Sequence, residues 1–259
     1  MKTSLIFHVL VFAMSLMLPI QPLHSEGLGI TSDKYLQTTK QVQAAIRHLE
    51  EGRLKDAKTA FEACLKQIPD HYQAHFYLAQ LAYENKDFSA ALEHIRTSIR
   101  SLGGLNFTYR KQSEDVRKHI EKKRQDLHFI LLSSLGNTVE RGCRLQTLTA
   151  EVNGINRELD VLESHSSAAR EGPEIPPVFH FVHGNCLLRL KQNAEAREQY
   201  ELAVKGDPTF SGAWNNLVFL WFSDKNLPRA LETIRQAESH GAVIGAPLKQ
   251  AVLDSSTRQ

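Results

Sequence analysis

The fold is decided by residues 38–104, where LKDAKTAFEACLKQIP at 54–69 is matched by FSAALEHIRTSIRSLG at 88–103. Small residues stand at the same place in both copies, as Ala57 and Ala91. The same interval returns near the other end of the chain, between Ala196 and Ala230. A constant stride of about 34 residues predicts repeated pairs of packed helices, because small side chains let two helices approach closely.

Apolar residues in the first copy follow the period of an α-helix. Val42, Ile46 and Leu49 fall on one face of the segment before Gly52, and a second apolar face runs on to Pro69, which ends its helix. In the second copy Gly103 and Gly104 stand where the proline would be, and they predict the end of that helix.

These units resemble the tetratricopeptide repeat (TPR), a helix–turn–helix unit that stacks on its neighbours. The resemblance implies an all-α helical-repeat solenoid of about four TPR-like units. The residues between the second and third units predict a long helical coiled-coil segment that interrupts the solenoid. The first TPR pair is expected at residues 38–105 and the second at 177–244. A linker at 167–176 precedes the second pair, and a capping tail at 245–259 follows it.

The insertion at residues 106–166 has its own pattern. Its apolar residues alternate in steps of three and four over Leu145, Leu148, Val152, Ile155, Leu159 and Leu162. Three successive heptads of this kind predict a coiled-coil seam. Glycines at 136 and 142 fit either the turn of a helical hairpin or a stutter in one helix. The seam Leu145–Leu162 could pair with the same seam of a second copy and so drive self-association. Alternatively, it packs within one chain and closes a helical hairpin.

The first residues differ in kind from the rest. Lys2 is followed by an apolar run from Leu5 to Leu18, and then by Pro19, Gln21 and other breaking residues. This pattern predicts a signal peptide at residues 1–25 and export to the periplasm or medium, followed by a flexible segment at 26–37. No membrane span is expected after cleavage. The alternative is an uncleaved N-terminal helix that anchors the protein.

Composition argues against several other classes of protein. The net charge of +2 gives no general attraction to nucleic acid, and 42% hydrophobic residues suffice for a buried core. The three cysteines, Cys64, Cys143 and Cys186, are too few and too widely spaced for a disulfide framework. We predict no cofactor and no nucleic-acid partner.

The TPR resemblance also implies a binding site. In that family the first helix of each repeat lines a concave groove that holds an extended peptide or a partner helix. The corresponding residues here are Phe76, Gln80, Tyr83, Phe181, Asn185, Arg189, Asn215, Asn216, Phe219 and Phe222. Asparagine can donate to and accept from a peptide backbone, arginine suits a carboxylate, and aromatic rings offer apolar area. The basic positions of a carboxylate clamp are not matched as a set.

Motifs for catalysis are missing from the sequence. It contains no nucleotide-binding loop, no Gly-x-Ser-x-Gly elbow and no His-Glu-x-x-His pair, so we predict no catalytic residues. His180, His183 and Cys186 follow one another in steps of three, and a metal-dependent enzyme site there is the alternative from another class. Steps of three drift around a helix, so the prediction is a packed, hydrogen-bonded His183 and no metal.

The sequence therefore predicts an exported, non-enzymatic TPR scaffold or adaptor. It would bind a partner protein or peptide in its groove, in envelope assembly or secretion. A structural protein that self-associates through its coiled coil is the second hypothesis.

Overall fold

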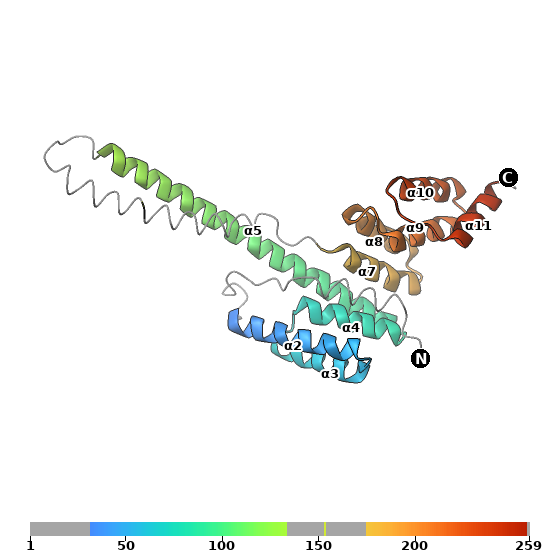
Figure 1. Ribbon diagram of the computed structural model, residues 1–259, viewed down its shortest axis with the longest axis horizontal. Helices are drawn as coiled ribbons and strands as arrows, with labels where there is room; N and C mark the ends of the chain where they lie inside the picture. Colours follow the sequence, from blue (N-terminus) through green and yellow to red (C-terminus); the bar gives the residue numbers. More distant parts are fainter. Residues whose placement is uncertain (1–31, 134–152, 154–174, 258–259) are drawn as a thin grey trace. The chain divides into compact units, whose positions relative to one another are not determined.

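The computed structural model describes residues 32–133, Asn153 and residues 175–257. Within them helix is the only regular secondary structure, which confirms the predicted all-α class. The helices are α2 (Ser32–Glu50), α3 (Leu54–Gln67), α4 (Tyr72–Glu84), α5 (Phe88–Ser133), α7 (Pro177–Arg189), α8 (Asn193–Gly206), α9 (Ser211–Ser223), α10 (Leu227–Ser239) and α11 (Ala246–Ser256) (Figure 1). The chain forms two units, residues 1–103 with 175–259, and residues 104–174.

One left-handed residue stands at the same place in the turn of each helix pair. The φ angle is 75° at Gly52, 63° at Lys86, 62° at Lys191 and 58° at Lys225. The following N–H closes each turn by donating to a carbonyl five residues back, as from Arg53 to His48 at 2.8 Å. This is the hydrogen bond of a Schellman motif, and it holds even lysine in a backbone region that glycine prefers.

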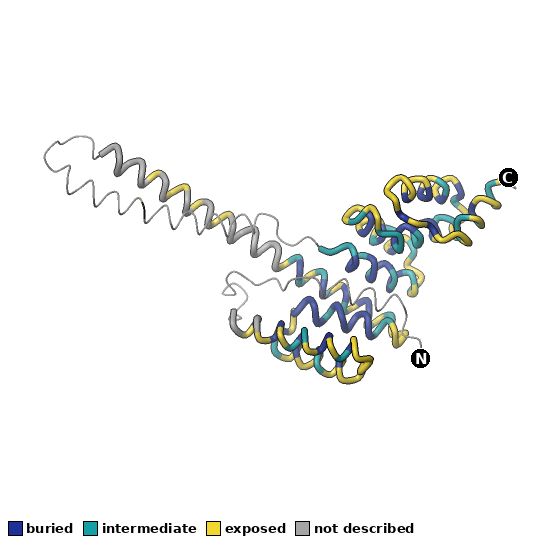
Figure 2. The backbone as a smooth tube through the Cα atoms, viewed as in Figure 1, coloured by how far each residue is buried: buried dark blue, intermediate teal, exposed yellow. Residues whose placement is uncertain are grey.

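The small residues lie where the two helices of each pair meet. Ala57, Ala91, Ala196 and Ala230 have no exposed surface. In the third pair the helices approach closely, since a Cβ atom on Gly184 of α7 would lie 2.6 Å from Cε1 of Tyr200 on α8. Figure 2 shows the buried residues gathered along these contacting faces. The predicted helix crossings are therefore confirmed.

Helix α5 does not end where the sequence predicted. It runs from Phe88 through Gly103 and Gly104 to Ser133, so the expected helix end at the glycine pair is wrong. Neither glycine has a positive φ. A glycine inside a helix costs only about 1 kcal/mol, and without a proline nothing forces the helix to stop.

The first helix also begins earlier than expected. Helix α2 starts at Ser32, so residues 32–37 are helical and do not belong to a flexible segment. Tyr35 explains the extension, because its buried ring stacks on the imidazole of His71 with the centroids 5.2 Å apart. The predicted signal peptide at 1–25 lies outside the described residues.

The second and third helix pairs contact each other directly, although the insertion separates them in sequence. The rings of Phe76 on α4 and Phe179 on α7 stack with centroids 4.3 Å apart. Arg96 of α5 pairs with Glu195 of α8 at 3.4 Å. The repeats therefore continue from α4 to α7 as neighbours. The six apolar residues of the predicted seam Leu145–Leu162 and almost all of the linker 167–176 lie outside the described residues.

Helix α11 covers the end of the fourth pair, as the capping tail was expected to do. Val252 is fully buried, and the preceding segment places Ala242 and Ile244 in the core. Val243 between them is 71% exposed. This alternation is that of an extended segment with one buried side.

Candidate partner-binding face

The candidate site lies on α4, α7 and α9, the first helices of the second, third and fourth pairs. We call the surface formed by its ten predicted residues the first-helix face. Phe76, Gln80 and Phe181 are buried; Tyr83, Asn185, Asn215, Asn216 and Phe222 are half-buried; Arg189 and Phe219 are exposed. Only part of the predicted set is therefore available to a partner.

Two of the predicted aromatic residues serve the core. Phe76 stacks on Phe179, and Phe181 packs against Phe210 with ring centroids 4.8 Å apart. Gln80 is only 4% exposed, and neither its amide nitrogen nor its amide oxygen has a hydrogen-bond partner among the described residues. These three side chains are packed beneath the first-helix face and add little to its accessible surface.

Asn185 and Asn216 hold the third and fourth pairs together. The Asn185 Oδ1 accepts two hydrogen bonds, from the Tyr200 hydroxyl at 2.8 Å and from Asn216 Nδ2 at 2.9 Å. Burial raises the pKa of the Tyr200 phenol, so the hydroxyl stays protonated and remains a donor. Both asparagines are thus engaged inside the chain.

Asn215 binds a peptide backbone, but that backbone belongs to its own chain. Its Nδ2 donates to Val243 O at 2.8 Å, and its Oδ1 accepts from Gly245 N at 2.8 Å. Val243 N also donates to the Ser211 Oγ at 2.8 Å. The amide therefore uses both its functions to fix the segment that leads into α11.

Replacing Asn215 with alanine should loosen α11 without unfolding the rest. Each such bond contributes about 0.5–1.5 kcal/mol, because water can replace Asn215 at the exposed Gly245 N–H and Val243 C=O. Hydrogen–deuterium exchange over residues 243–257 should become faster, while exchange in α2 to α4 stays unchanged. Unaltered exchange in α11 would show that Asn215 does not hold this segment.

Arg189 forms a separate cluster at the end of α7. Its Nε donates to the Tyr83 hydroxyl at 3.0 Å, and its guanidinium lies 5.9 Å from the ring centroids of both Tyr83 and Phe88. These contacts link the second and third pairs and hold an exposed positive charge at the edge of the face.

Exposed apolar side chains make up the rest of the accessible surface of the first-helix face. Phe219 on α9 is 46% exposed, and Leu253 on α11 is 38% exposed. One full stride of the repeat separates them, so they occupy the same place on successive first helices. Helix α9 contains no Asp, Glu, Lys or Arg. Sequence reasoning missed Leu253, although the stride from Phe219 pointed to it.

The alternative site near Cys186 does not come together. His180 Nδ1 lies 3.0 Å from Gln199 Oε1, and burial raises the pKa of the Cys186 thiol to about 12. A free thiol with such a pKa stays protonated near neutral pH and is a poor nucleophile. His183 is packed with Gln199 beside it, and the hydrogen bond of its ring stays a prediction.

Metal sites and membrane spans are both lacking in the part of the chain that the structure describes. No group of three His, Cys, Asp or Glu side chains there could hold a metal ion. No helix there combines the length and apolar character needed to cross a membrane.

Comparison with known proteins gives matches of two kinds. A structure of PilF from Pseudomonas aeruginosa aligns at 15% identity over 87% of this chain and 88% of its own, with a TM-score of 0.36. A thermophilic TPR protein from Thermus thermophilus aligns at 19% identity over 85% and 99%, with a TM-score of 0.34. PilW, described as a type IV pilus biogenesis factor, aligns at 14% identity over 82% and 80%, with a TM-score of 0.38.

No curated protein matches the sequence. A family model, by contrast, matches residues 42–104 and is that of the tetratricopeptide repeat. The match covers the first two helix pairs, whose stride, turns and buried alanines recur in the other two. Residues 42–104 are therefore a tetratricopeptide repeat segment, and the two later helix pairs have the same build.

Proposed function

We propose that this protein is a non-enzymatic scaffold that holds a partner protein against its first-helix face. The observation that carries the proposal is the exposure of Phe219 on α9, a helix without a charged residue. A large aromatic side chain half in water on an uncharged surface gains free energy when a partner covers it. The second helices α3, α8 and α10 instead carry several charged residues each.

The engaged asparagines favour a helical partner over an extended one. An extended peptide needs hydrogen-bond partners for its backbone when it is buried. The amides of Asn185, Asn215 and Asn216 are already bonded within the chain, so they offer it few. A helix satisfies its own backbone and needs only apolar contact. We therefore expect an amphipathic helix to lie over Phe219 and Leu253.

Replacing Phe219 with aspartate is expected to weaken partner capture by roughly ten-fold or more, because burying a charge in an apolar contact is costly. The measurement is recovery of crosslinked partner from intact cells with an affinity-tagged chain. Asn185 is unsuitable for this test, because changing it would also break the bonds with Tyr200 and Asn216.

Leu202 provides the matched control. It is 42% exposed, close to the value for Phe219, but it lies on the second helix α8. Leu202→Asp should leave partner recovery at the native level. Equal loss with both variants would point to general damage, and no loss with Phe219→Asp would remove this face from binding.

We further propose that the scaffold works outside the cytoplasm, in envelope assembly or secretion. This rests on the apolar run from Leu5 to Leu18 and the breaking residues after it. Self-association through Leu145–Leu162 remains the second candidate, on the strength of its three heptads.

A further inference from the structure

Helix α11 occupies the place of a first helix in a fifth repeat, and two of its residues differ sharply from those of α9. Trp221 and Phe222 stand near the end of α9, and one stride later α11 carries Ser255 and Ser256. Two large aromatic side chains are thus replaced by two of the smallest polar ones. Losing the volume of the two rings leaves a cavity beside α11 unless other residues fill it.

The contact between α8 and α9 shows what Trp221 does. The guanidinium of Arg197 on α8 lies 4.5 Å from the ring centroid of Trp221, and it also pairs with Asp224 just after α9. The tryptophan therefore covers the second helix of the preceding repeat, with an ion pair beside it. In this contact an aromatic ring of α9 and the carboxylate just after that helix both bind the arginine of α8.

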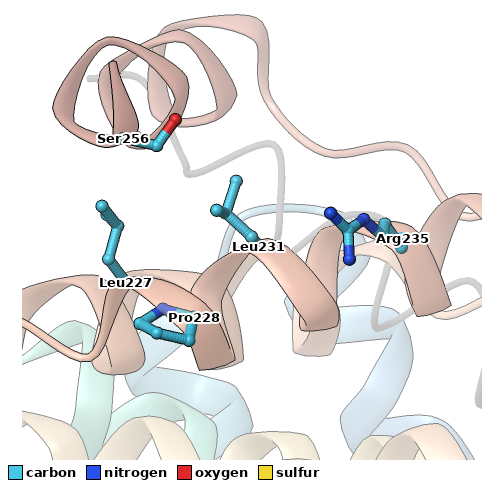
Figure 3. Close-up of a pocket in the computed structure, with 5 residues that line it drawn as sticks. All are labelled: Leu227, Pro228, Leu231, Arg235 and Ser256. Carbon is cyan, nitrogen blue, oxygen red and sulfur yellow. The ribbon is translucent and has the colours of Figure 1, made fainter. Parts of the chain in front are cut away.

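A pocket of about 370 Å³ lies at the corresponding place between α10 and α11. It is lined by Leu227, Pro228, Leu231, Arg235 and Ser256. In Figure 3 Leu227 and Leu231 extend from α10 towards Ser256, and Arg235 lies further along α10. Leu231 occupies the position of Arg197, and Ser256 follows Ser255, which has the position of Trp221, so the pocket lies beside the place of the Arg197–Trp221 contact.

The walls of this pocket are mainly apolar. The serine hydroxyls of α11 donate to their own helix, Ser255 to Ala251 O at 2.8 Å and Ser256 to Leu253 O at 2.7 Å. The volume lies within the range of roughly 300–1,000 Å³ that is usual for ligand pockets. Arg235 adds a positive charge at the side, and it forms an exposed ion pair with Glu232 at 3.6 Å.

We propose that the pocket between α10 and α11 receives an aromatic side chain from a partner protein, with a carboxylate beside it for Arg235. The template is the chain's own Trp221 with Asp224, which fills the preceding contact against Arg197. An aromatic ring would bury apolar area against Leu227 and Leu231, and Arg235 would favour an acidic neighbour. The site is distinct from the first-helix face and does not require that face to bind.

Ligand-observed fluorine NMR can test the pocket with N-acetyl-5-fluorotryptophan, which carries both an indole ring and a carboxylate. The fluorine resonance of the probe should shift in a saturable way when the full native chain is added. N-acetyl-5-fluorotryptophan amide, which lacks the carboxylate, should bind more weakly. Ser256→Phe restores the residue that α9 has at this place. It should weaken probe binding by about ten-fold or more, because the new ring fills the pocket.

Two further variants keep the test decisive. Leu231→Glu should also abolish the shift, and it stands in if Ser256→Phe does not fold. Phe219→Ser should leave probe binding unchanged while weakening partner capture, so this site and the proposed function can fail separately. A probe shift that persists in both pocket variants, or no saturable shift with the native chain, would overturn the proposal.

Discussion

Replacing Gly184 with alanine is expected to lower the free energy of unfolding by roughly 1–3 kcal/mol, although alanine is the better helix former. The new Cβ would lie 2.6 Å from Cε1 and 2.9 Å from Cδ1 of Tyr200. That ring is fully buried, and its hydroxyl is bonded to Asn185. It can move aside only by breaking this bond and disturbing the fourth pair.

Gly103→Ala is the matched control, and the opposite sign is expected. Gly103 also lies inside a helix, α5, but a Cβ there would meet nothing within 4 Å. Alanine should therefore raise stability by up to about 1 kcal/mol. Urea unfolding of both variants gives the comparison. Equal effects at the two positions would contradict the close contact between α7 and α8.

A second large effect is expected from pH, through the buried imidazole of His71. Burial lowers its pKa to about 4. Its Nδ1 accepts from Ala74 N at 3.4 Å, which caps α4, and its Nε2 lies 3.4 Å from the Thr39 hydroxyl. That hydroxyl donates to Tyr35 O, so it accepts from Nε2–H. Both nitrogens are thus used by the neutral form.

The sign follows from where the proton binds. Between about pH 6.5 and 4 the unfolded chain binds a proton at His71 and the folded chain does not, so stability falls as pH falls. The loss approaches roughly 3 kcal/mol near pH 4 and is absent above the unfolded pKa. His183, whose pKa is also lowered to about 4 by burial, acts in the same direction.

Urea unfolding at several pH values between 4 and 7 measures this dependence. His71→Asn keeps a side chain suited to capping α4 but cannot take up the proton. The variant should show a shallower fall of stability with decreasing pH, whatever its stability at pH 7. An unchanged slope would mean that His71 is not the source.

The architecture could be predicted from sequence because its signals are local and repeated. The constant stride placed Ala57, Ala91, Ala196 and Ala230 at buried crossings, as observed. The end of α5 could not be read from Gly103 and Gly104, because a glycine pair weakens a helix without ending it. The turn lysines carry no sequence signal for positive φ, since the turn is closed by backbone bonds.

The sequence predicted where the residues of the candidate site lie, but not whether their side chains are free to bind a partner. The stride identified Asn185, Asn215 and Asn216 correctly as residues of the first helices. Their use depends on partners remote in sequence, such as Val243 for Asn215 and Tyr200 for Asn185. Arg189 meets Tyr83 only because the second and third pairs pack together. Such tertiary bonds leave no trace in a local pattern.

The direct stacking of Phe76 on Phe179 also bears on how the chain folds. Each helix pair is built from contacts between near neighbours in sequence, which form quickly. The stacking of Phe76 on Phe179 must instead close a loop that contains the whole insertion. Because the entropy of loop closure grows only with the logarithm of length, the insertion adds little to the final free energy. We therefore expect the two halves to acquire their structure independently and to dock last, the insertion governing the speed of assembly more than its outcome.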